Sequence, residues 1–141
     1  MRGVIFLTHT QGKDLETLQC TPMEYSWLYM ITVAETEPFQ RKVGRLLSEG
    51  EKIELIAYLS MNPNAGVLIQ GTGGIRKLRW ARSGQGKSGG VRIIYYYHNE
   101  EMPLYLLTLF GKNEKTNISM EEKKLLSKAV RILVKYWSNK S

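Results

Sequence analysis

The chain has 141 residues, of which 43% are hydrophobic and 10% aromatic, and its 20 Lys and Arg against 13 Asp and Glu give a formal charge of +7. This composition is sufficient for one packed domain, and no uninterrupted apolar run approaches the ~20 residues of a membrane span, so we expect a soluble, cytoplasmic protein that has no contact with membranes. The single Cys20 excludes an internal disulfide framework, and two histidines exclude a zinc constellation, so we expect no metal and no cofactor.

The first 29 residues show neither helical nor strand periodicity over a useful length. The segment 4–10 is too short and too polar for the apolar region of a secretory signal. Residues 31–33 form a short β-favouring run, directly after Met30, which could serve as an internal start. We therefore expect the domain to span residues 30–141, with residues 1–29 as an extension outside it.

Two helices are predicted next. Thr36 is a suitable N-cap, Pro38 fits the first turn, and Phe39 and Val43 begin an apolar face. Ser48 followed by a glutamate three residues later predicts a capping box for a second helix, which ends at an Asn-Pro pair at residues 62–63. The short connection predicts an antiparallel helical hairpin.

Strand patterns follow over 75–81, 91–98 and 104–110, joined by turns at 82–90 and 99–103 that suit antiparallel neighbours. Ser119 with Glu122 then caps a final helix with a broad apolar stripe. The order predicts an α+β fold: an N-terminal helical hairpin packed on one face of a curved antiparallel sheet of about four strands, with a C-terminal helix.

The positive charge is concentrated in one window. Residues 73–92 contain six cations and no acidic residue, and so contribute +6 of the total. The six are Arg76, Lys77, Arg79, Arg82, Lys87 and Arg92. A concentrated block of this kind attracts phosphates, whereas evenly scattered charge would indicate only solubility.

Three cations in this window are candidate site residues. The two-residue period of a strand places Lys77 and Arg79 on one face, at a spacing of ~7 Å that suits adjacent phosphates, although a solvated outer face is the alternative. Arg92 lies within an apolar strand, where an arginine is costly unless it is paired or faces a cleft. Its alternative is a salt bridge to a helix glutamate such as Glu54 or Glu122.

Other motifs are weaker. The segment 84–88, GQGKS, lacks the first glycine of a phosphate-binding loop, because Ala81 occupies that position, and a strand rather than a helix is predicted to follow. Histidine is a common acid–base residue type, but His98 closes a strand beside a turn, which favours a surface residue. In the segment 110–115, Lys112 and Lys115 could contact phosphate and Glu114 could accept a proton, with an ordinary polar loop as the alternative.

The stretches 69–77, 89–96 and 105–114 together resemble the RelE/HigB family of toxins from bacterial type II toxin–antitoxin operons, most closely the HigB-like branch. The similarity runs from about residue 31 to residue 137. It implies a RelE-like fold and a metal-independent endoribonuclease that enters the ribosome and cuts translated mRNA. In that reaction the 2′-hydroxyl attacks the adjacent phosphate, leaving a cyclic phosphate and a free 5′-hydroxyl.

By position, the resemblance implies catalytic roles for Lys77, Arg79, Arg92 and Lys112. Further RNA contacts are expected at Arg76, Arg82, Lys87 and Lys115, and Glu114 and His98 are weak acid–base candidates. The expected partners are the ribosome, mRNA and a cognate antitoxin of helix-turn-helix type. The alternative function is a non-catalytic, ParE-like toxin that inhibits DNA gyrase.

Overall fold

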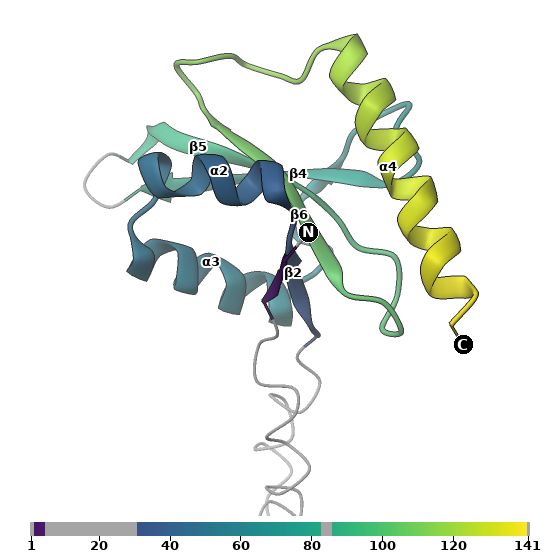
Figure 1. The fold of residues 1–141 in the computed structure, drawn as a ribbon. Helices are drawn as coiled ribbons and strands as arrows, with labels where there is room; N and C mark the ends of the chain where they lie inside the picture. The colour runs from purple at the N-terminus through teal and green to yellow at the C-terminus, as the bar shows by residue number, and fades with distance from the viewer. Residues whose placement is uncertain (1, 5–30, 83–85, 141) are drawn as a thin grey trace, which may run out of the picture.

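The computed structural model describes residues 2–4, 31–82 and 86–140, although the side chains of residues 2–4 and 82–89 lie outside this description. The described residues form six strands and three helices, in the predicted α+β class (Figure 1). In chain order they are β1 (Arg2–Val4), β2 (Val33–Glu35), α2 (Glu37–Leu46), α3 (Glu49–Met61), β3 (Val67–Leu68), β4 (Ile75–Arg82), β5 (Gly86–Tyr96), β6 (Leu104–Gly111) and α4 (Met120–Ser138). Within these residues, no helix combines the length and apolar character that a bilayer crossing requires.

The sheet differs from the predicted one in size and direction. Its described strands lie in the order β1-β2-β6-β5-β4-β3, which is six strands rather than about four. The pairing of β2 with β6 is parallel, whereas the other pairs are antiparallel, so the sheet is mixed. A parallel pair requires a long crossover, here residues 36–103, and the local pattern of a three-residue strand does not indicate its distant partner.

Helices cover both faces of the sheet rather than one face. On one side, Phe39 of α2 and Leu55 of α3 pack with Ile93 in one core cluster, and on the other side Val130 of α4 packs with Ile94 in a second cluster (Figure 1). The physical reason is that all eight residues of β6 are buried, and both faces of such a strand must be covered.

The local helix signals are confirmed. Ser48 caps α3 and Ser119 caps α4, each in a capping box with the glutamate three residues later. Thr36 is the N-cap of α2 by position, but its hydroxyl makes no capping bond. The Thr36 hydroxyl instead donates to the carbonyl groups of Leu106 and Leu107 in β6, which ties the start of α2 to the sheet. The two helices follow strands β1 and β2 rather than opening the fold.

The hairpin of β4 and β5 is longer than the predicted strands. The ladder continues past a register shift at Trp80 as far as the Arg82–Gly86 pair, so most of the predicted turn at 82–90 is strand. The edge strand β3 was not predicted, because two residues are too few for a periodic pattern.

The first described residues also join the sheet. Arg2–Val4 pairs antiparallel with β2, in the register Arg2 to Glu35, although residues 5–30 lie outside the described part. The expectation that the domain starts near residue 30 therefore stays a prediction.

Replacement of Ser127 by alanine is expected to stabilise the fold. Its side chain is buried against a cavity of about 490 Å³ between α4 and the turn at 71–73, and its hydroxyl has no hydrogen-bond partner among the described residues. Alanine removes this unsatisfied group and has the higher helix propensity, so the free energy of unfolding should rise by about 1 kcal/mol in urea titrations. The matched control Ser119→Ala deletes a working cap and should lower it by about 1 kcal/mol. A loss of stability in Ser127→Ala would contradict this interpretation.

Candidate nucleic-acid interface

Strand β4 divides its cations between the two faces of the sheet. Lys77 lies opposite Ile94, which belongs to the α4-side core, whereas Arg76 lies opposite Tyr95 of the other core. The Arg76 guanidinium donates to the carbonyl oxygen of Asn64 at 3.2 Å and to that of Gly66 at 2.7 Å. Arg76 therefore holds the loop before β3 and does not share a face with Lys77, and its predicted RNA contact stays a prediction.

Two arginines face each other at the centre of the hairpin. Arg79 is directly opposite Arg92 in the β4–β5 ladder, and Arg92 is opposite Phe110 in the β5–β6 ladder. Like charges directly opposite each other destabilise a sheet. An anion bound between the two guanidinium groups would remove this repulsion.

Arg92 is the unusual member of the pair because its side chain is only 8% exposed. Neither Glu54 nor Glu122 forms a salt bridge with it, and no ion pair of Arg92 occurs among the described residues. Burial lowers the pKa of the Arg92 guanidinium, and the adjacent Arg79 lowers it further. A buried cation with no carboxylate is costly for folding, which is typical of a residue retained for a ligand.

Three of the predicted cations lie in one cleft. A cavity of about 450 Å³ is lined by Lys77, Arg79 and Arg92, together with Ala65, Val67, Leu78 and Thr116. The Lys77 ammonium donates to the Asn117 side chain at 3.4 Å, and none of the three cations forms an ion pair within the described residues. The cleft therefore offers converging positive charge to an anionic ligand.

Sequence reasoning missed the walls of this cleft. Ala65 and Val67 come from the loop and edge strand before β4, and Thr116 comes from the loop before α4. These residues carry no charge and belong to no motif. In the sequence they are marked only by their positions, shortly before the basic strand and directly after the segment 110–115.

In the loop between β6 and α4, Lys115 is paired within the protein, and the predicted phosphate contacts of Lys112 and Lys115 stay predictions. The Lys115 ammonium lies 2.7 and 2.8 Å from the two carboxylate oxygens of Glu122, and 5.1 Å from the Phe110 ring centre. Burial raises the pKa of Glu122, but the bonds from Lys115 and from the Ser119 amide outweigh it and hold the pKa below its usual value. Lys115 is thus neutralised internally, whereas Lys112 is exposed and does not line the cleft.

Glu114 has a geometry that disfavours proton transfer. Its carboxylate accepts a hydrogen bond from the Gly111 amide at 3.1 Å and lies 3.4 Å from the Arg45 guanidinium. The hydrogen bond from the Gly111 amide, together with the positive charges of Arg45 and Lys42, holds the pKa of Glu114 below its usual value. A carboxylate stabilised in its ionised form is a weak proton acceptor, and Glu114 is not among the residues that line the cleft.

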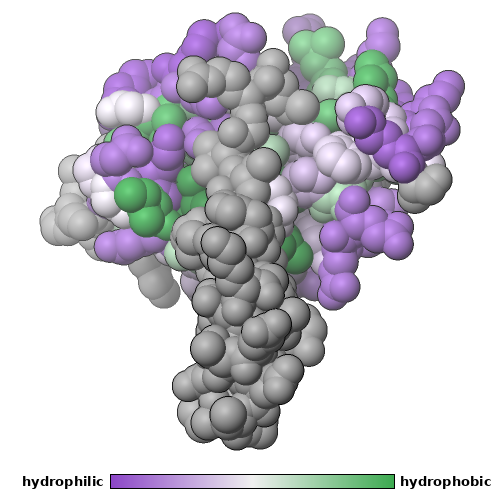
Figure 2. Space-filling model, turned by 60° about the horizontal axis from the view of Figure 1, so that its bottom comes forward, coloured by the Kyte–Doolittle hydropathy of each residue, from purple (hydrophilic) through white to green (hydrophobic). Residues whose placement is uncertain are grey.

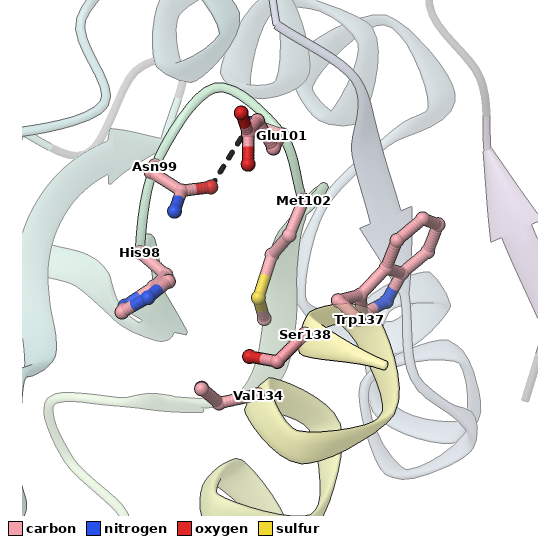
Figure 3. Close-up of a pocket in the computed structure, with 7 residues that line it drawn as sticks. All are labelled: His98, Asn99, Glu101, Met102, Val134, Trp137 and Ser138. Atoms are coloured by element: carbon pink, nitrogen blue, oxygen red, sulfur yellow. Dashed lines mark hydrogen bonds between the residues drawn. The ribbon is translucent and has the colours of Figure 1, made fainter. Parts of the chain in front are cut away.

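His98 lies at another place in the molecule. It lines a small pocket of about 120 Å³ with Met102 and the C-terminal residues Trp137 and Ser138 of α4 (Figure 3). Its Nδ1 atom is 3.2 Å from the Tyr96 hydroxyl. Arg92 is in the middle of β5, about 13 Å before the strand ends at Tyr96, so His98 does not belong to the cleft.

The side chains of Arg82 and Lys87 lie outside the described part of the structure, and their predicted RNA contacts stay predictions. What the described residues define is a small α+β protein with a cleft on its central hairpin that is lined by three cationic side chains. Residues 66–140 match the family described as the RelE toxin of the RelE / RelB toxin-antitoxin system, and this range includes β3 to β6 and all of α4. The chain belongs to this family of toxins, which implies a cognate antitoxin as its partner.

Proposed function

We propose that this toxin is a ribosome-dependent endoribonuclease of the HigB-like branch, which acts in the cytoplasm and is controlled by a helix-turn-helix antitoxin. The observation that carries the proposal is the cleft in which Lys77, Arg79 and the buried Arg92 converge, with no carboxylate partner among the described residues. Cations held at fixed positions before the substrate arrives suit a reaction in which negative charge develops on a phosphate.

In the proposed reaction, the 2′-hydroxyl of one nucleotide attacks the phosphorus of the next phosphodiester. The new O2′–P bond forms as the P–O5′ bond breaks. The attacking hydroxyl gives up its proton and the leaving O5′ takes up one, so the products are a cyclic phosphate and a 5′-hydroxyl with no net change in protons. Arg79 and Arg92 would stabilise the phosphorane from opposite strands of one hairpin, and Lys77 would hold a neighbouring phosphate.

The proposal is tested by mapping RNA ends in cells that express the chain. We expect new 5′ ends within codons of translated mRNAs, and these ends should accept a label from polynucleotide kinase without phosphatase treatment because they carry a hydroxyl. Untranslated copies of the same mRNAs serve as the control and should stay intact. DNA breaks with intact transcripts would instead support the gyrase-inhibiting alternative and contradict the proposal.

A further inference from the structure

Helix α4 has more apolar surface than the sheet covers. One side of the helix, including Val130, is buried in the α4-side core. A second stripe at intervals of four, three and four residues points away from the sheet: Leu125, Ala129, Ile132 and Tyr136. Its three large side chains are 69%, 62% and 50% exposed. In Figure 2, hydrophobic residues are exposed among hydrophilic ones on the right, the side on which α4 lies in Figure 1.

The spacing of this stripe is that of the a and d positions by which one helix packs against another. A helix that only covers a sheet needs a single apolar face, and α4 already has one in Val130 and its neighbours. Three large apolar side chains exposed on one further face mark an interaction surface.

A row of cations accompanies the stripe on one side. Lys128 and Lys135 each lie one position before a stripe residue, at the g positions of the same heptad pattern, and Lys124 and Arg131 lie slightly farther around the helix. Within the described residues, none of the four forms an ion pair. The other charged groups near the stripe are Lys140, 5.0 Å above the Tyr136 ring, and two carboxylates at the start of the helix, Glu121 and Glu122, of which Glu122 is paired with Lys115.

These charges distinguish between the possible occupants of the face. A second copy of this chain would bring its own row of cations against Lys128 and Lys135, in a protein with a formal charge of +7. A membrane surface suits a broad apolar face, whereas the exposed stripe here is narrow and has heptad spacing. A helix with its own apolar stripe, flanked by carboxylates, matches both the spacing and the charge.

We propose that the exposed face of α4 is a docking site for an acidic amphipathic helix of a partner protein. The apolar stripe supplies the contact area, and the flanking cations select for negative charge and fix the orientation of the bound helix. This face involves none of the residues that line the cleft, so the proposal does not depend on the nuclease activity.

The test uses the full-length protein and a designed, fluorescently labelled peptide of about three heptads, with leucine at positions a and d and glutamate at e and g. Binding is measured by fluorescence anisotropy. We expect saturable binding, and we expect Ile132→Glu to weaken it about tenfold or more, because Ile132 is at the centre of the stripe. Lys128→Glu should weaken binding of the glutamate peptide and strengthen binding of a peptide with lysine at e and g.

The matched control is Ile53→Glu on α3, which changes an isoleucine of similar exposure, 53%, and should leave the affinity unchanged. Circular dichroism verifies that each variant is folded. Equal binding of the two peptides would overturn the proposal, as would wild-type affinity in Ile132→Glu. The proposal would also be overturned if the glutamate peptide failed to bind and the protein instead self-associated, or bound anionic phospholipid vesicles, in a way that Ile132→Glu abolished. Cleavage of mRNA is scored separately, so loss of the proposed function does not affect this outcome.

Discussion

Replacement of Arg92 by methionine is expected to remove RNA cleavage and at the same time to stabilise the protein. Methionine keeps much of the length of the side chain but removes a buried cation that lies opposite Arg79 and has no carboxylate partner in the described part of the chain. The free energy of unfolding should rise by about 1 to 2 kcal/mol, because the desolvation cost and the cross-strand repulsion both disappear. The cleavage rate should fall by about a hundredfold or more, since a group that stabilises the developing charge is lost.

Two matched variants separate this effect from general damage. Arg76→Met, on the neighbouring strand β4 and the opposite face of the sheet, should lower the free energy of unfolding by about 1 to 2 kcal/mol, because two hydrogen bonds to backbone carbonyls are lost. His98→Ala should leave the cleavage rate within about twofold of the wild type, since His98 lies in a different pocket. The assignment of the cleft is wrong if Arg92→Met is fully active. The measurements are single-turnover cleavage on programmed ribosomes and urea titration.

The second large effect, a loss of stability, is expected on substitution of Tyr95. Its hydroxyl holds the loop that forms one wall of the cleft. The hydroxyl donates to the Pro63 carbonyl and accepts from the Gly66 amide, each at 2.8 Å, and the ring is fully buried. Tyr95→Phe leaves both backbone groups without this partner and should lower the free energy of unfolding by about 2 to 3 kcal/mol. Ala65 and Val67 continue this loop into the cleft, so substrate binding should weaken as well.

The control for this prediction is Tyr97→Phe on the segment that follows β5. Tyr97 is half-buried, but its hydroxyl makes no hydrogen bond within the described residues, so its loss should change stability by less than about 0.5 kcal/mol. Thermal and urea unfolding measure both variants, and equal stability of Tyr95→Phe and the wild type would contradict the role given to the Tyr95 hydroxyl.

The parts of the fold that depend on near neighbours could be predicted from the sequence. The Ser48 and Ser119 capping boxes are complete within four residues, and the alternation along β4 separates Arg79 from Trp80 by period alone. The parallel pairing of β2 with β6 could not be predicted, because it joins residues about seventy positions apart and depends on the packing of the intervening helices.

The candidate site shows the same division between local and distant information. Strand period brings Lys77 and Arg79 together, and the apolar neighbours of Arg92 indicate an unusual burial. Residue spacing does not predict the pairing of Lys115 with Glu122 or the hydrogen bonds from Arg76 to two carbonyl groups. These contacts depend on side-chain conformations and on the paths of the loops. For this reason the contacts that hold Arg76 and Lys115 within the protein could not be predicted, whereas their RNA contacts stay predictions.

The parallel pairing of β2 with β6 has a consequence for the way in which this toxin becomes active. The Thr36 hydroxyl donates a hydrogen bond to the carbonyl of Leu106, which is 70 residues later in the sequence. Thr116, which lines the cleft, comes later still. Long-range pairings of this kind form late and slowly in folding. A nascent chain therefore exposes its cations from β4 onward well before they line one cavity. The ribosome that synthesises the toxin is in contact with an incompletely folded protein until synthesis has passed the loop before α4.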